Sequence, residues 1–276
     1  MSAATDIASH YARGSLTAAI ESALAKAGID RADVTIDDLA PVDEFHIGGS
    51  GATVHLLSHL DLTEGRRVLD VGCGIGGTAR HLAREHGARV CGVDLTEEFV
   101  ETGRALDRWT SMEERIELRV ADAATLPFDD GAFDAAVMLH VGMNVEDKGA
   151  LFSEVARTLG SGGRFAIYDI MRVGDGEAHY PVPWAGDATI DFTESPEAYE
   201  RHLADAGFEV IHAERRTEAA REFFGRARAA ADAPGGPPPL GLHLIAGPEI
   251  GARVGNVAAM FEAGRLVPVE MIAARP

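Results

Sequence analysis

The sequence has few cysteines, few lysines and no long apolar run, and these shortages exclude several classes of protein. Its two cysteines, Cys73 and Cys91, are too few for a disulfide framework and lack the spacing of metal ligands. Both lie in apolar stretches, so we expect buried thiols in a reducing compartment. No stretch approaches the roughly 18 apolar residues of a membrane span, and the N-terminus lacks the pattern of a signal peptide. These absences predict a cytoplasmic protein.

Positive charge is also scarce. The 25 Lys and Arg residues face 44 Asp and Glu residues, which gives a formal net charge of −19. Nucleic acids and anionic membranes are bound through basic patches, so neither is an expected partner. An acidic surface keeps a protein soluble, but it would also attract a cationic substrate, and charge alone does not separate these interpretations. We expect a monomer or a homodimer that acts on a small molecule.

Apolar β-type runs alternate with helical periodicity along most of the chain, as in a parallel sheet covered on both faces. The predicted strands are 66–71, 88–94, 115–122, 133–141, 163–170, 208–214 and 265–274, and the predicted helices are 15–27, 50–60, 76–86, 96–109, 147–159, 195–206, 217–231 and 248–264. Segment 171–194 combines Gly, Pro and aromatic residues without periodicity. It is therefore predicted to be a loop inserted over the carboxyl edge of the sheet.

The strongest chemical signal is the stretch VLDVGCGIGGTARHLA at 68–83, in which a strand ends at Asp70 and a glycine-rich turn precedes a helix. Glycine lets the backbone turn tightly and a ligand approach closely, and the amino end of the helix offers free N–H groups to an anion. Nicotinamide and flavin enzymes share this pattern, and they share an acid that closes the second strand, here Asp94. The glycine loop alone therefore leaves the cofactor open.

Further segments narrow the choice. Asp122 and Ala123 close the third strand and precede LPFDDGAFDAAV (126–137), and LGSGGRFAIYD (159–169) leads into the fifth strand. Together with the glycine loop, these segments resemble class I S-adenosylmethionine-dependent methyltransferases, above all the branch of ubiquinone-biosynthesis and sarcosine/dimethylglycine methyltransferases. The resemblance extends over about residues 42–216.

The resemblance implies a Rossmann-like, doubly wound α/β sheet of seven strands, mostly parallel with an antiparallel last strand, and helices on both faces. It also implies S-adenosylmethionine as methyl donor and S-adenosylhomocysteine as product. Asp70 and the glycines would hold the methionine part, Asp94 the ribose and Asp122 the adenine. The implied cofactor-binding set is His46, Gly49, Asp70, Gly72, Gly74, Gly76, Asp94, Leu95, Asp122, Ala123 and Leu139. Residues 1–60 would form a helical cap over the active site, and residues 61–276 the methyltransferase domain with the lid 171–194.

Two histidines are the catalytic candidates. His140 follows the fourth strand, where this fold places the methyl acceptor, and could act as a base or orient the acceptor; it could also be a structural histidine bonded to a backbone carbonyl. His46 lies in DEFHIGGSGAT (43–53), which resembles a segment that crosses the methionine end of the cofactor. Alternatively, His46 caps a helix while Phe45 and Ile47 pack.

The substrate-binding candidates are Tyr11, Asn144, Asp169, Trp184 and His243. Three of them have a plainer interpretation: Tyr11 as a packing residue, Asp169 as a cap of the next turn, and Trp184 as part of an apolar lid. Trp184 could instead hold a methylated ammonium by cation–π attraction. No metal is expected, because the histidines at 46, 140, 179 and 243 are scattered and HEXXH spacing is absent.

The resemblance therefore implies methyl transfer to a small-molecule nitrogen or oxygen, either of an amine such as a glycine-betaine precursor or of a phenolic or natural-product hydroxyl. A Rossmann-type nicotinamide-dependent oxidoreductase is the main alternative. The Tyr-x-x-x-Lys pair of such oxidoreductases is impossible here, because Lys26 and Lys148 are the only lysines and neither has a tyrosine four residues before it. A cofactor-binding protein without catalysis is the third alternative.

Overall fold

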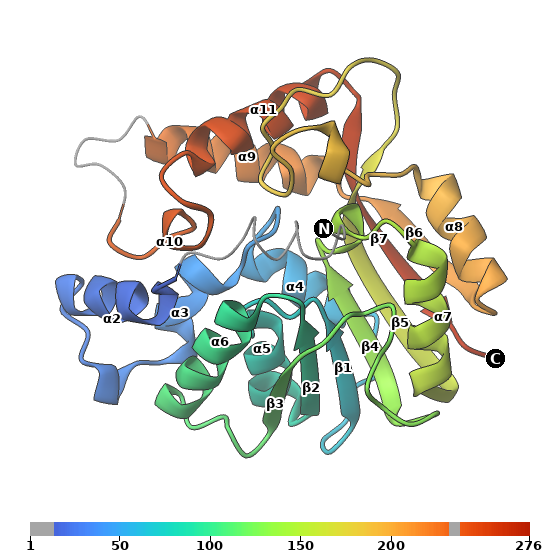
Figure 1. Cartoon of the computed structure of the whole chain (residues 1–276), viewed down its shortest axis with the longest axis horizontal. Helices are drawn as coiled ribbons and strands as arrows, with labels where there is room; N and C mark the ends of the chain where they lie inside the picture. The colour runs from blue at the N-terminus through green and yellow to red at the C-terminus, as the bar shows by residue number, and fades with distance from the viewer. Residues whose placement is uncertain (1–13, 232–237) are drawn as a thin grey trace.

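The strands of the chain form one seven-stranded sheet with the order β3-β2-β1-β4-β5-β7-β6 (Figure 1). The structure is a computed structural model and describes residues 14–231 and 238–276. The strands are β1 (Arg67–Val71), β2 (Arg89–Asp94), β3 (Ile116–Val120), β4 (Phe133–Leu139), β5 (Leu159–Arg172), β6 (Glu209–Arg215) and β7 (Leu266–Ala274). Strands β1 to β5 pair in parallel, and β7 runs antiparallel to both β5 and β6. The predicted sheet is confirmed, including its antiparallel last strand.

Helices cover both faces of this sheet because alternate strand residues are apolar on both sides. One face packs against α4 (Ser50–Leu57), α5 (Gly77–His86) and α6 (Glu97–Trp109), and the other against α7 (Lys148–Thr158) and α8 (Pro196–Asp205). Neighbouring β1 residues show the alternation, since Val68 packs on the face covered by α4, α5 and α6, and Leu69 packs on the face covered by α7 and α8. None of the helices in the ranges 14–231 and 238–276 has the length and apolar character of a membrane span.

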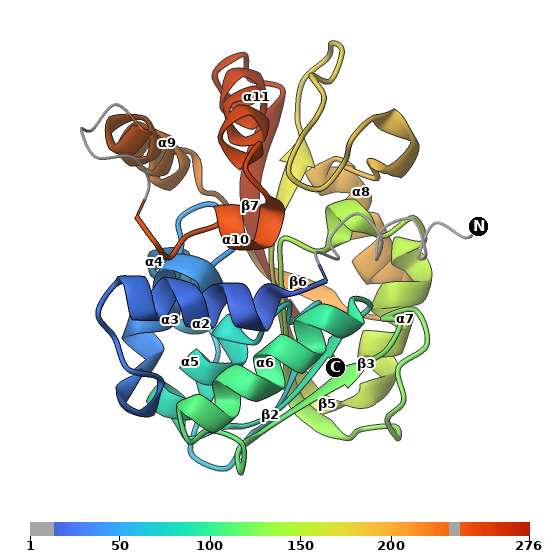
Figure 2. The ribbon, with the colours of Figure 1, turned by 60° about the vertical axis from the view of Figure 1, so that its left-hand side comes forward.

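Two further groups of elements lie around the carboxyl edge of the sheet (Figure 2). The first contains α2 (Leu16–Lys26), the short helix η1 (Arg31–Asp33) and α3 (Ile36–Asp43), and its apolar side chains pack against Ile75, Phe99 and Leu106. The second contains α9 (Thr217–Ala231) and α11 (Ile250–Glu262), which share a small core with the segment after β5, whereas Ile245 of the short helix α10 (His243–Ala246) packs in the core of the first group. Along the chain, β5 and the short helix η3 (Ala188–Ile190) lie between α7 and α8.

The structure differs from the sequence prediction at three places. Helix α3 was not predicted, because it has eight residues and Pro41 interrupts its pattern; its reciprocal cap between Thr35 and Asp38 was the available signal. Strand β5 continues to Arg172, so the loop begins two residues later than predicted. The expectation of two buried thiols is correct for Cys73 and wrong for Cys91, which is half-buried and lies beside Glu117 of the edge strand β3.

A fully buried arginine ties α3, α5 and α6 together. The guanidinium of Arg80 donates hydrogen bonds to Asp43 (2.8 Å), to Asp107 (2.6 Å) and to the carbonyl of Ile75 (2.7 Å). Burial raises the pKa of both carboxyl groups to about 6, although the positive charge of Arg80 opposes this shift. At neutral pH the triad therefore holds two ionised carboxylates around one cation, and the cation compensates their lost hydration.

Arg80→Met should destabilise the protein by roughly 3 to 5 kcal/mol at pH 7, because it leaves two buried carboxylates without a cation. Urea unfolding measures the change. Arg84→Met is the matched control on the same helix, since Arg84 bonds Asp37 and Glu85 at the surface and should contribute less than about 1 kcal/mol. The deficit of Arg80→Met should shrink at pH 5, where both carboxyl groups take up protons. Equal effects of the two substitutions would contradict a stabilising role of the triad.

Candidate active site

A cleft opens at the carboxyl ends of β1, β2 and β4, where the strand order reverses and open α/β sheets bind ligands. Most of the predicted cofactor residues line it: His46, Asp70, Gly72, Gly74, Asp94, Leu95, Asp122, Ala123 and Leu139. Gly49 and Gly76 do not. Gly49 begins α4 and Gly76 begins α5, and each adopts a positive φ (55° and 87°) that sets the direction of its helix. Their part in cofactor binding stays a prediction.

Asp70 and Asp94 bring two carboxylates to adjacent strand ends. Asp94 is held by the backbone, since the N–H of Gly74 donates to Oδ2 (2.9 Å) and the N–H of Thr96 to Oδ1 (2.8 Å). Asp70 is almost fully buried, and its Oδ2 has no hydrogen-bond partner. Burial raises the pKa of Asp70 to about 7, and the neighbouring charge of Asp94 adds to the rise. An unpaired buried carboxylate oxygen beside a second carboxylate favours a cationic ligand.

The glycine loop keeps the cleft open. Gly72 has a φ of 69°, and a Cβ at this position would overlap the side chain of Val141. Gly74 has a φ of 54° and no neighbour where its Cβ would lie, so only its backbone conformation requires glycine. The loop therefore lets a ligand approach the backbone at the amino end of α5.

A second, apolar pocket adjoins the cleft. Its lining residues are aromatic or aliphatic apart from two histidines: Phe45, His46, Ile47, His140, Met143, Ile170, Pro183, Trp184, Phe223, Phe224, Leu242, Val254 and Val257. The pocket is built by the segment before α4, the segment after β5, α9 and α11. Among the described lining residues no lysine, arginine, aspartate or glutamate occurs.

His46 and His140 line both the cleft and the apolar pocket, with ring centroids 5.8 Å apart. The Nε2 of His46 lies within hydrogen-bond distance of the Gly49 carbonyl, the Thr53 hydroxyl and the carboxylate of Glu44 (3.1, 3.1 and 3.2 Å). Burial lowers its pKa to about 4, so the ring is neutral at pH 7. This network fixes the orientation of His46.

His140 stands in a strained backbone conformation with a φ of 55°, which non-glycine residues rarely adopt. Its N–H donates to the carbonyl of Tyr168 (2.7 Å), which holds the turn at the end of β4. The Nε2 of its ring is buried without a hydrogen-bond partner, and burial and the neighbouring His46 lower its pKa well below the usual value. The structural alternative, a ring bonded to a backbone carbonyl, therefore finds no support at Nε2.

The substrate-binding candidates separate into two groups. Asn144 lines the cleft, and Trp184 lines the apolar pocket with its indole N–H donating to Asp191 (3.0 Å). Asp169 and His243 line neither cavity, and Tyr11 lies outside the described residues. Asp169 is fully buried and accepts a hydrogen bond from the Tyr199 hydroxyl (2.8 Å). Its carboxylate supports the backbone at Gly142, where no room remains for a Cβ, and its contact with substrate stays a prediction.

Several lining residues were not predicted. The cleft also contains Asp43, Phe45, Cys73, Thr78, Val93, Thr96, Phe99, Ala121, Val141 and Val145. Most are apolar and read as ordinary core residues in the sequence. The polar exceptions are Asp43, Thr78 and Thr96. Thr78 occupies the first turn of the helix after the glycine loop, where free N–H groups are available to a ligand, and this position was the available signal.

Comparison with known proteins gives the family. A methyltransferase-domain model matches residues 69–167. The chain is 31% identical over 194 residues to a sarcosine/dimethylglycine N-methyltransferase of Halorhodospira halochloris, covering 70% of this chain and 68% of that protein. It is 37% identical over 134 residues to the methyltransferase GfsG of Streptomyces halstedii, covering 49% of this chain and 48% of that protein. The chain thus spans about half the length of GfsG.

The fold agrees with these matches. The structure of a geranyl diphosphate C-methyltransferase from Streptomyces coelicolor A3(2) superposes with a TM-score of 0.66 at 22% identity, covering 83% of this chain and 79% of that one. The sheet order, the glycine loop and the two acids at the strand ends define a class I methyltransferase. The chain belongs to the family of S-adenosylmethionine-dependent class I methyltransferases, and none of these matches supports the nicotinamide alternative.

Asp70 should give the ligand-free protein a stability that falls as the pH rises. Its pKa is about 7 in the folded state against an ordinary value of 3.8, so between these values the folded state binds one proton more than the unfolded state. Asp70→Asn removes this dependence. From pH 5 to pH 8 it should therefore gain about 3 kcal/mol relative to the wild type, measured by urea unfolding at both pH values.

Asp134→Asn, which removes a half-buried carboxylate bonded to the N–H of Arg67, is the control for the loss of a charge. A difference between Asp70→Asn and wild type that is the same at pH 5 and pH 8 would contradict the raised pKa of Asp70.

Proposed function

We propose that this protein transfers a methyl group from S-adenosylmethionine to a hydroxyl or amine group of an apolar small molecule. The observation that carries the proposal is the position of His46 and His140, which line both the polar cleft and the apolar pocket. A donor in the cleft and an acceptor in the pocket would meet at these two rings. Adjacent binding of two reactants in fixed orientation is the largest contribution that a protein makes to such a displacement.

The residues of the cleft fit the proposed cofactor. The unpaired Oδ2 of Asp70 would accept a hydrogen bond from the ammonium group of the methionine part, and the glycine loop would leave room for its carboxylate at the amino end of α5. Asp94 would take the ribose hydroxyls and Asp122 the adenine. When bound, the cofactor supplies a methyl group on a positively charged sulfur, and the paired charges of Asp70 and Asp94 favour such a cation.

His140 would act on the acceptor. Its Nε2 is neutral, unpaired and buried, so it accepts a hydrogen bond, and then the proton, from an acceptor O–H or N–H at the junction of the two cavities. The low pKa of His140 in the ligand-free site opposes protonation of its ring. The acceptor, however, loses its proton as the new bond forms, and His140 is then the nearest free base that can take it. His46, held by Glu44 and Thr53, would shape the opposite wall.

The apolar pocket favours one class of acceptor. The carboxylate of sarcosine and the phosphate of phosphoethanolamine would need cationic or hydrogen-bonding partners, and the pocket lining offers neither apart from the two histidines. A phenol or an apolar natural-product alcohol would bury its carbon surface against Trp184, Phe223 and Phe224. Between the two acceptor classes implied by the sequence, the pocket supports the hydroxyl-bearing one over the glycine-betaine precursor.

The remaining features of the proposal follow from composition and packing. With a net charge of −19 we propose a small molecule as the only substrate, without nucleic acid or membrane as partner, and a cytoplasmic monomer or homodimer. We propose residues 1–60 as a cap, because α2 and α3 pack against α5 and α6 beside the cleft. The segment 171–194 would form the lid, since Pro183 and Trp184 line the apolar pocket.

Methyl transfer should be measured with S-adenosylmethionine and a panel of acceptors. Apolar phenols and alcohols should react with a kcat/KM at least tenfold above that of sarcosine, dimethylglycine and phosphoethanolamine, because only the former match the pocket. A preference for the charged amines would overturn the acceptor class. Cofactor binding without transfer to any acceptor would favour the non-catalytic alternative, and a rise in melting temperature with nicotinamide nucleotides alone would overturn the cofactor.

His140→Asn and His140→Ala should each slow methyl transfer roughly 10²-fold while cofactor affinity changes far less, because the ring acts on the acceptor. Asparagine tolerates a positive φ better than alanine, so the two variants separate loss of the ring from backbone strain. The readouts are turnover, cofactor affinity by calorimetry and melting temperature. Near-normal turnover in a stable His140→Ala protein would exclude the catalytic role and leave His46 as the candidate.

A further inference from the structure

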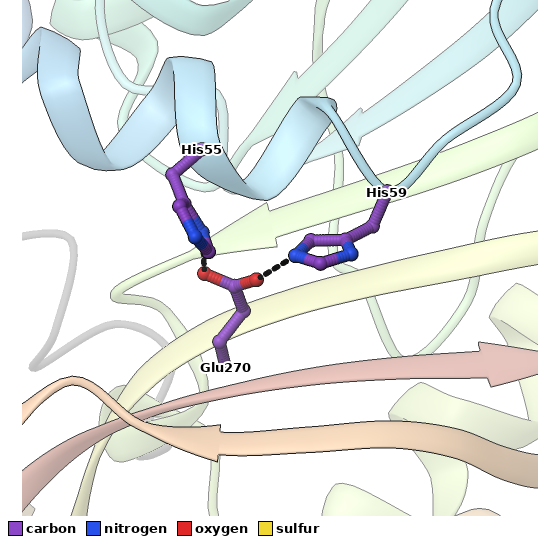
Figure 3. A group of neighbouring side chains, drawn as sticks. All are labelled: His55, His59 and Glu270. Atoms are coloured by element: carbon purple, nitrogen blue, oxygen red, sulfur yellow. Dashed lines mark hydrogen bonds and ion pairs between the residues drawn. The ribbon is translucent and has the colours of Figure 1, made fainter.

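A cluster of histidines surrounds a buried glutamate outside both cavities. His55 and His59 lie one turn apart on and just after α4 and point toward Glu270 of β7 (Figure 3). The Nδ1 of His55 lies 3.0 Å from Oε2 of Glu270, and the Nε2 of His59 lies 3.0 Å from Oε1. One ligand atom from each residue lies within 4.8 Å of the others. Sequence analysis expected no metal and overlooked this pair, although its i, i+4 spacing was visible.

The atoms at the centre of the cluster are not satisfied by one another. His59 Nε2 and Glu270 Oε1 are buried without a hydrogen-bond partner, because their 3.0 Å contact has the length but not the direction of a hydrogen bond. His212 of β6 contributes a third such atom, its Nε2, which lies 3.9 Å from the same Oε1. Three unpaired buried atoms that share one space are costly unless a further group joins them.

Access and charge both suit a cation. The side chains of His55, His59 and His212 are 37%, 30% and 33% exposed, whereas that of Glu270 is 2% exposed. The carboxylate therefore lies at the base of a ring of imidazoles that opens to solvent. Glu214 approaches His212 (3.8 Å). Within residues 14–231 and 238–276, Arg216 is the one cation in contact, with Nη1 3.4 Å from Oε2 of Glu270 and within hydrogen-bond distance of both ring nitrogens of His55. Two carboxylates thus face one guanidinium.

We propose that His55, His59 and Glu270 bind a divalent transition-metal ion, with His212 as a further ligand. Imidazole and carboxylate together suit zinc, and less so magnesium or calcium, which prefer oxygen alone. Zinc–ligand bonds of about 2.0 to 2.2 Å place tetrahedral ligand atoms about 3.3 Å apart. Each histidine nitrogen lies 3.0 Å from one oxygen of Glu270, and one ligand atom from each residue lies within 4.8 Å of the others, so side-chain rotations would bring the three groups to bonding distance of one ion.

Such an ion would fasten α4 to the last two strands of the sheet. His46 and Gly49 immediately precede α4, and His46 lines both cavities. The bound ion would therefore act on stability and on the position of the segment before α4, and it would not touch the reacting groups. This inference stands independently of the proposed function.

Zinc binding should be measured by calorimetry on the full chain after treatment with a chelator. We expect one zinc ion per chain, and at a free zinc concentration one hundredfold above Kd a rise in melting temperature of about 5 °C. His59→Ala and Glu270→Gln should each weaken binding at least tenfold. Arg216→Gln should tighten it several-fold, because a competing positive charge is removed, whereas a purely structural ion-pair network predicts only lower stability for that variant.

His202→Ala is the matched control, since His202 also bonds a glutamate, Glu194 (3.0 Å), with a similarly exposed side chain. Its zinc affinity should equal that of the wild type. Circular dichroism of the metal-free variants shows whether each is folded, and His59→Ala, at a partly exposed position, keeps the test open if Glu270→Gln does not fold. Absence of saturable binding, or equal affinity in wild type and His59→Ala, would overturn the proposed site.

Discussion

The shape of the cofactor cleft depends on one buried guanidinium. Arg80 reaches from α5 to the end of α3 through Asp43, to α6 through Asp107 and to the glycine loop through the Ile75 carbonyl. Asp43 lies in the cleft wall, two residues before Phe45. A change that displaces Arg80 therefore moves three walls together. Without this guanidinium, two buried carboxylates would lose their compensating cation.

The two cavities differ in the physics by which they select a ligand. The cleft concentrates negative charge at Asp70 and Asp94 in a site of low polarity, so it distinguishes ligands by charge. The adjoining pocket has almost no polar atoms and distinguishes ligands by shape and apolar area. His46 and His140 form the boundary, and both stay neutral because burial lowers their pKa. A neutral boundary does not repel a cationic donor.

The sequence predicted the elements with strong periodicity and the residues with a local motif. Strands such as β1 and β2, and the acids that end them, follow from short-range pattern, because strand ends and glycine turns are local features. The buried ion pairs of Arg80 could not be predicted, because its partners lie 37 and 27 residues away and only the packing of the helices brings them together. The hydrogen bond between Tyr199 and Asp169 could not be predicted for the same reason, because the two residues lie 30 positions apart.

Part of the apolar pocket is encoded by a stretch of the chain that contributes nothing to the cleft. Every residue of the cleft lies between Asp43 and Val145, whereas Phe223, Phe224, Leu242, Val254 and Val257 of the apolar pocket belong to the connection between β6 and β7. Mutations in that connection can reshape one cavity and leave the other intact. Related methyltransferases can thus keep the same methyl donor and differ in their acceptors through changes in this one connection. The connection is therefore a suitable segment to exchange between such enzymes in the laboratory.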